Sequence, residues 1–158
     1  MASPRDIRQL ALLALYQFDS RAGEDSQSIH DSLGDVHTLE EEGLVFSDLK
    51  KDFTENQRQK AFDLARAAYE HREIADIELN ELSTEWTVSR MPVVDRSILR
   101  MAHYEMTATV DPKPKAAVNE AVQLAKMFST KNSPGFVNGI LDKILKRVLA
   151  GADAAATE

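Results

Sequence analysis

The residues that could perform chemistry in this chain do not stand at the spacings that a catalytic or metal site requires. There is no cysteine, which excludes disulfides, thiolate metal sites and a cysteine nucleophile. The six glycines form no phosphate-cradling loop, and no serine lies in a nucleophile elbow. The sequence therefore predicts a protein that is not an enzyme and has no cofactor. Four histidines stand apart, with no partner at metal-ligand spacing: His30, His37, His71 and His103.

Two stretches instead place polar or aromatic side chains where helix packing alone would not require them. Residues 94–106 carry Asp95 near their start, and residues 136–145 carry Phe136 and Asn138. Both stretches repeat apolar residues at spacings of three and four, which is typical of amphipathic helices. Function is therefore expected on helix surfaces. Asn138 is expected to be a buried polar link between helices.

The elements that position these stretches are all predicted to be helices. Ser3 and Asp6 form a capping pattern that begins the first helix. Thr54 begins a second capping pattern and a long helix to about Leu82, with Ile74 on its buried face. No stretch alternates apolar and polar residues as a strand would, so the predicted fold class is all-α. Three further helices are expected to begin at prolines: Pro92, Pro114 and Pro134.

Length and composition indicate one domain made of two parts. Residues 1–150 are predicted to form a single domain, with one subdomain in 1–85 and another in 86–150. Trp86 is expected to be buried at the junction between them. Residues 151–158, small and polar, are predicted to form a disordered tail.

Charge is spread unevenly along the chain. The net charge is −7, but residues 1–85 carry 9 basic and 19 acidic groups, whereas residues 86–158 carry 10 and 7. This asymmetry suggests one face for a polyanion. Ten acids lie in residues 19–52, which are predicted to be an acidic connection. No apolar run reaches the roughly 20 residues of a membrane span, and no secretory signal is visible, so a cytoplasmic protein with no membrane contact is expected.

Taken in order along the chain, the predicted helical stretches resemble the NusB family of bacterial transcription antitermination factors. Four blocks carry the similarity: residues 5–17, 94–106, 117–126 and 133–143. The resemblance implies a NusB-like bundle of about seven helices in two subdomains. It also implies a non-catalytic protein that pairs with NusE, a small-subunit ribosomal protein, and holds boxA-type RNA of ribosomal leader transcripts. In the family, binding of this RNA together with NusE keeps the RNA polymerase elongation complex transcribing ribosomal RNA operons.

The resemblance further implies which residues make these contacts. Single-stranded RNA is usually held by basic groups on its phosphates and by aromatic side chains that stack on its bases. Asp95 matches the position at which the family meets its ribosomal-protein partner. The expected RNA-binding residues are basic, aromatic or amide side chains: Arg5, Arg8, Tyr16, Lys113, Lys115, Asn132 and Phe136.

Several of these residues also have a purely structural interpretation. Tyr16 is equally compatible with burial, and Phe136 with anchoring the last helix on the core. Asp95 is equally compatible with a surface ion pair to Arg96 or Arg100. For the whole protein, the alternative function is an acidic helical interaction module, or a self-associating adaptor with weak RNA binding. A targeting domain for an RNA-modifying enzyme is a third possibility, and a homodimer is compatible with any of them.

Overall fold

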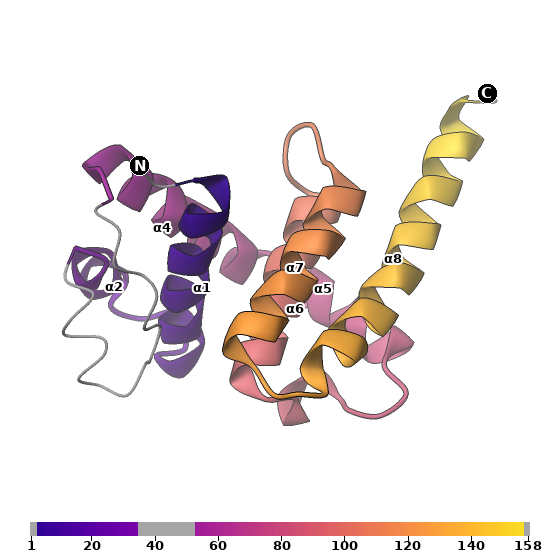
Figure 1. Ribbon diagram of the computed structural model, residues 1–158, viewed down its shortest axis with the longest axis horizontal. Coiled ribbons are helices and arrows are strands. Elements are labelled where there is room, and N and C mark those ends of the chain that lie inside the picture. Colours follow the sequence, from indigo (N-terminus) through magenta and orange to yellow (C-terminus); the bar gives the residue numbers. More distant parts are fainter. Residues whose placement is uncertain (1–2, 35–52, 157–158) are drawn as a thin grey trace. The chain divides into compact units, whose positions relative to one another are not determined.

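The computed structural model describes residues 3–34 and 53–156, with side chains up to residue 151. Within these residues the chain forms seven α-helices and one short 3-10 helix, with no strand (Figure 1). The all-α prediction is confirmed. The described residues group into two compact units, Met1–Glu70 and His71–Glu158. Most of the acidic connection predicted for residues 19–52 lies outside the described residues, although its first part contains a short helix.

The first unit is built from α1 (Pro4–Ser20), α2 (Ser26–Ser32) and α4 (Glu55–Glu70). The predicted capping box of α1 is present: the Asp6 backbone N–H donates to Ser3 Oγ at 3.2 Å, and the Ser3 backbone N–H donates to Asp6 Oδ2 at 2.7 Å. Helix α1 packs against α4. Their contact is aromatic toward the end of α1, where the Phe18 ring lies 5.7 Å from that of Phe62 and 5.6 Å from that of Tyr69.

The turn after α1 requires glycine at one position. Gly23 has a φ of 81°, in the left-handed region that favours glycine. A Cβ atom at this position would lie 2.8 Å from Cε1 of Tyr69. Both the backbone conformation and the close approach of the Tyr69 ring therefore exclude a side chain here.

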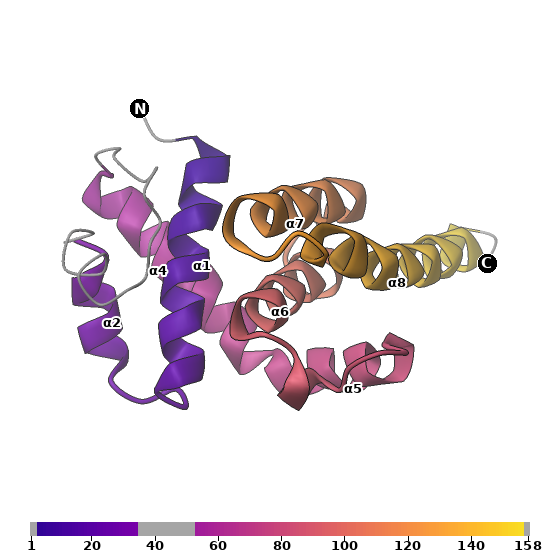
Figure 2. The ribbon, with the colours of Figure 1, turned by 60° about the horizontal axis from the view of Figure 1, so that its bottom comes forward.

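The second unit has α6 (Val93–Thr107) at its centre. Helices α5 (Arg72–Leu82), α7 (Pro114–Phe128) and α8 (Ser133–Ala156) all pack against it, and Figure 2 shows α6 between α5 on one side and α7 and α8 on the other. The 3-10 helix Val88–Arg90 leads into α6. The core is formed by fully or almost fully buried apolar side chains, including Ile98, Leu99, Met101, Ala121, Leu141 and Ile144.

The long helix predicted from Thr54 to about Leu82 is in fact two helices. Helix α4 ends at Glu70 and α5 begins at Arg72, with a turn at His71. The apolar stripe of α4 does not continue into α5, whose buried residues are Ala75 and Leu79. Ile74, which we expected to be buried, is therefore 63% exposed.

Two other expectations differ from the structure. Trp86 does not plug the core: it is 47% exposed. Helix α8 continues to Ala156, into the stretch that we expected to be disordered. That stretch is rich in alanine, which has the highest helix propensity of all residues. Among the described residues, no helix is long and apolar enough to cross a membrane.

Candidate functional site

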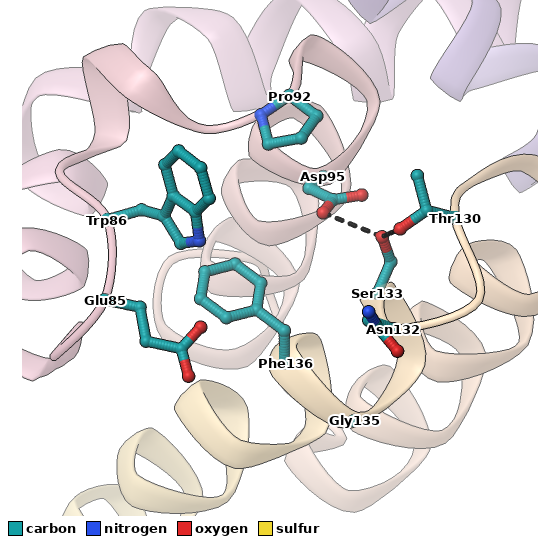
Figure 3. A pocket seen from close by; sticks show the side chains of 9 residues that line it. All are labelled: Glu85, Trp86, Pro92, Asp95, Thr130, Asn132, Ser133, Gly135 and Phe136. Atoms are coloured by element: carbon teal, nitrogen blue, oxygen red, sulfur yellow. Dashed lines mark hydrogen bonds between the residues drawn. The ribbon is translucent and has the colours of Figure 1, made fainter.

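The second unit contains a cavity of about 590 Å³ between the segment that precedes α6 and the turn that joins α7 to α8 (Figure 3). This volume lies within the usual range for small-molecule sites. The lining combines two aromatic rings with carboxylates, an amide and hydroxyls: Glu85, Trp86, Pro92, Asp95, Thr130, Asn132, Ser133, Gly135 and Phe136.

Asp95 builds the inner side of this cavity from the first turn of α6. Its carboxylate accepts a hydrogen bond from Ser133 Oγ at 2.9 Å and another from Ser129 Oγ. Ser133 begins α8, and Ser129 follows the last residue of α7. One buried carboxylate, 3% exposed, therefore joins the start of α6 to the α7–α8 turn. Thr130 extends the network, since its hydroxyl lies 2.8 Å from that of Ser133.

This placement corrects the expectation that Asp95 lies on the surface. The suggested ion pair with Arg100 is wrong, because the Arg100 guanidinium donates to both carboxylate oxygens of Asp76, at 2.9 and 2.7 Å. A direct contact between the Asp95 side chain and a partner protein would have to replace its bonds to Ser129 and Ser133. No local pattern predicts these bonds, because the two serines lie in another part of the chain.

Two aromatic side chains line the cavity from different elements. Phe136 lies in the first turns of α8 and is half-buried. Trp86 lies between α5 and the 3-10 helix, where hydrogen bonds to side chains fix the backbone. The backbone N–H of Trp86 donates to Ser83 Oγ at 3.2 Å, and the backbone N–H of Val88 donates to Asn80 Oδ1 at 2.8 Å. Trp86 was not predicted to be a site residue, because a lone tryptophan is more often buried than exposed.

The structure brings some of the predicted RNA-binding residues together and not others. Asn132 and Phe136 line the same cavity, and Asn132 is exposed. Lys113 and Lys115 are also exposed but lie at the first turn of α7, whereas Asn132 follows its last turn. A helix of 15 residues is about 22 Å long, so these lysines are not part of the cavity. Figure 1 shows the two ends of α7 well apart.

The remaining predicted residues belong to the first unit. Arg5 is exposed, whereas Arg8 and Tyr16 are half-buried on α1. Their participation in an RNA surface stays a prediction. Asn138, by contrast, is not the buried polar link that we expected, because it is exposed on α8.

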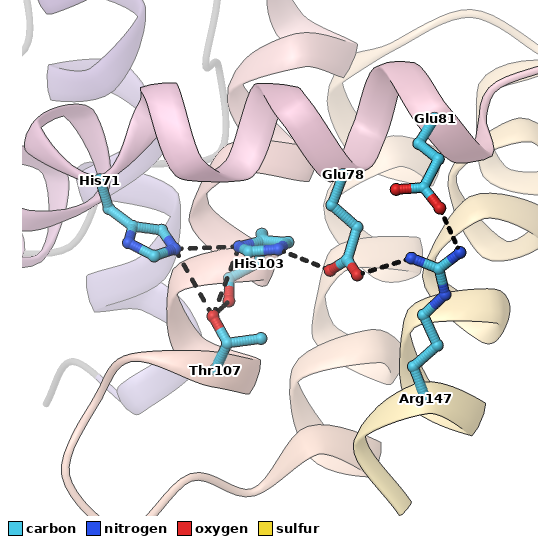
Figure 4. A network of polar contacts seen from close by, with 6 residues as sticks. All are labelled: His71, Glu78, Glu81, His103, Thr107 and Arg147. Atoms are coloured by element: carbon cyan, nitrogen blue, oxygen red, sulfur yellow. Dashed lines mark hydrogen bonds and ion pairs between the residues drawn. The ribbon is translucent and has the colours of Figure 1, made fainter. Parts of the chain in front are cut away.

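The histidines of the second unit have a structural explanation (Figure 4). His103 is buried on α6; its Nε2 lies 2.8 Å from Glu78 Oε1 of α5, and its Nδ1 lies 3.0 Å from His71 Nε2. Arg147 of α8 donates to the other oxygen of Glu78 at 3.0 Å. This chain of contacts ties three helices together. The described part of the chain contains no group of His, Cys, Asp or Glu that could hold a metal ion.

Burial lowers the pKa of His71, and the neighbouring His103 lowers it further. When both rings are neutral, each contact from His71 through His103 to Glu78 can have one donor and one acceptor. His71 Nε2–H then donates to His103 Nδ1, and His103 Nε2–H donates to Glu78. Charge on both rings would place two like charges within hydrogen-bond distance of each other.

The described part of the chain thus combines an all-α fold with a cavity lined by polar and aromatic side chains. Comparison with known proteins gives its family: the NusB family profile matches residues 5–146, and the chain belongs to that family. The resemblance seen in the sequence is confirmed.

Curated relatives and solved structures agree with this assignment. The transcription antitermination protein NusB of Desulforapulum autotrophicum is 37% identical over the whole of both chains. That of Symbiobacterium thermophilum is 40% identical over 98% of each. NusB of T. maritima has a similar structure, with a TM-score of 0.68, 30% identity, and coverage of 92% of this chain and 93% of that one. NusB in a crystal structure with NusE and double-stranded RNA shares the fold at 23% identity, with a TM-score of 0.66.

Proposed function

We propose that this protein is an RNA-binding transcription antitermination factor. With the ribosomal protein NusE it binds boxA-type leader RNA and keeps RNA polymerase elongating on ribosomal RNA operons. Family membership supports this function, and the crystal structure of a similarly folded NusB with NusE and RNA agrees with it. The observation in this chain that carries the proposal is the cavity that holds both Asn132 and Phe136. An exposed amide and an accessible ring are groups that read single-stranded RNA.

Charge supports a requirement for the partner. The net charge of −7 opposes binding to a polyanion, and the basic groups on the proposed RNA surface are few. Tight RNA binding is therefore expected only for the pair of proteins.

The proposed partner surface includes the start of α6. Asp95 is buried beneath this surface, so we infer that it shapes the surface from within by holding α6 against the α7–α8 turn. The acidic exposed residues of α5 and its exposed Ile74 and Ile77 are compatible with the alternative function, a protein-interaction module with weak RNA binding.

Titration of a labelled boxA RNA with this protein, with NusE and with both tests the proposal. We expect the pair to bind far more tightly than either protein alone. Arg8→Ala should weaken binding and reduce the slope of log affinity against log salt by about one phosphate contact. Arg66→Ala, an exposed arginine of the same unit that we do not place on the RNA surface, is the control and should leave the slope unchanged. Binding of NusE without any RNA binding by the pair would favour the interaction module.

A further inference from the structure

The cavity has a second aromatic wall that the proposed function leaves unused. A tryptophan side chain is a large apolar group whose burial stabilises a fold. Trp86 is nevertheless 47% exposed, although its backbone is fixed on both sides by hydrogen bonds to Ser83 and Asn80. An accessible indole on a hydrogen-bonded stretch of backbone is suited to stacking on a flat ligand. Phe136 lines the same cavity from α8, so two ring surfaces are available.

The polar groups of the cavity indicate which hydrogen-bonding groups a flat ligand must present. Asp95 and Ser133 are occupied with each other. Glu85 is exposed, lines the cavity, and in Figure 3 its carboxylate lies on the same side as Trp86 and Phe136. An ionised carboxylate only accepts hydrogen bonds, and its two oxygens best accept two donors that lie side by side. The ligand should therefore present two adjacent N–H groups on the edge of an aromatic ring.

Among the RNA bases, guanine alone presents such an edge. Its Watson–Crick edge carries the N1–H and the N2 amino group next to each other. Uracil has one N–H between two carbonyl oxygens, which would repel a carboxylate, and adenine and cytosine have an amino group beside a ring-nitrogen acceptor. The exposed Lys131, next to Asn132 at the rim, can contact a neighbouring phosphate.

We propose that this cavity binds one guanine base of single-stranded RNA. Trp86 stacks on the base, and Glu85 accepts hydrogen bonds from its N1–H and its amino group. Asn132 contributes its amide at the rim. This inference rests on the proposed RNA-binding function and adds to it both the base and two residues, Glu85 and Trp86, that read it.

The chain provides its own reporter for a test, because Trp86 is its only tryptophan. Short oligonucleotides are titrated into the full chain with NusE present, and tryptophan fluorescence is recorded against NusE and RNA blanks. The probes are a uridine pentamer and the same pentamer with guanosine or inosine at its centre. Inosine keeps the N1–H and lacks the amino group. We expect quenching and the tightest binding with guanosine, weaker binding with inosine and the weakest with uridine alone.

Variants separate stacking from base reading. Trp86→Ala should weaken binding of every oligonucleotide by about 5- to 150-fold, whereas Trp86→Phe should retain most of the affinity. Glu85→Gln should weaken binding of the guanosine pentamer and reduce the preference for guanosine over inosine, because the amide keeps only one acceptor oxygen. Thermal melting of each variant checks that it is folded; Glu85 is exposed and Trp86 is 47% exposed, so little change is expected.

The inference and the proposed function fail in different ways. If boxA RNA binds the pair normally, yet Trp86 fluorescence is constant and Trp86→Ala binds like the wild type, Trp86 does not stack on a base, and the proposed function stands. Equal affinities for the three pentamers, with quenching in each, would overturn the assignment to guanine. If no RNA binds with or without NusE, the proposed function is wrong and the inference falls with it.

Discussion

Replacing the buried carboxylate of Asp95 tests how the second unit is held together. Asp95 is 3% exposed and accepts hydrogen bonds from Ser129 and Ser133, which lie at the end of α7 and the start of α8. A hydrogen bond to a charged group contributes about 1.5–3 kcal/mol to stability. Asp95→Asn keeps the size of the side chain and one acceptor oxygen, so it should lose about one such bond. The neutral amide also avoids the cost of keeping a charged group away from water, and this gain offsets part of the loss.

We therefore expect Asp95→Asn to lower the free energy of unfolding by about 1–3 kcal/mol, and Asp95→Ala by about 2–4 kcal/mol. For a chain of 158 residues, 1 kcal/mol corresponds to roughly 2–4 °C in Tm. Denaturant unfolding followed by circular dichroism measures the first quantity and thermal melting the second. Asp63→Asn is the matched control, since the contacts of Asp63 are exposed: an ion pair with Arg66 and a hydrogen bond from Gln59 Nε2. It should change stability by less than about 0.5 kcal/mol. If Asp95→Asn unfolds like this control, the carboxylate does not hold the three helices together.

Two further predictions concern single positions. Stability should fall as the pH decreases below about 6.5, the ordinary pKa of histidine. The reason is that the pKa of His71 is lowered in the folded chain, so the unfolded chain binds the proton more readily. His71→Gln should flatten this pH dependence of stability in melts between pH 7.5 and 5, and an unchanged slope in the variant would contradict the prediction. Gly23→Ala should destabilise by at least about 1–2 kcal/mol, because its φ is 81° and the new Cβ would meet Tyr69. Gly139→Ala, on an exposed part of α8 with open space around it, should instead stabilise by about 0.5–1 kcal/mol, and equal effects in the two variants would refute the argument.

Local signals predicted the helices well. The capping box of Ser3 and Asp6 begins α1, and Pro114 begins α7, as expected. These signals act within one turn of a helix, so neighbouring residues determine them. The break at His71 was missed because no proline or glycine marks it. A count of apolar spacings cannot show where one helix ends and the next begins.

The candidate site was harder to predict, because its groups come from distant parts of the sequence. Phe136 and Asn132 were found through resemblance to a family. Trp86 was not, because a single tryptophan is more often buried, and only the tertiary structure shows its ring to be accessible. Asp95 was expected at the surface because it matches the position at which the family meets its partner, and because Arg96 or Arg100 could pair with it there. Its hydroxyl partners are 34 and 38 residues further along the chain, and no local pattern connects them.

The bonds of Asp95 connect the two surfaces on which the proposed function depends. The same carboxylate fixes the start of α6, where we place the partner surface, and the α7–α8 turn, which carries Asn132 and Phe136 at the cavity. A partner that orders the start of α6 would therefore also order the cavity, and RNA bound in the cavity would favour the partner by the same free energy. Under this reasoning, cooperation between NusE and RNA requires no contact between them. The cooperation between NusE and RNA should weaken in Asp95→Asn even where the variant retains its affinity for NusE alone and for RNA alone. Cooperation that arises only from contacts between NusE and RNA would be unaffected by this substitution.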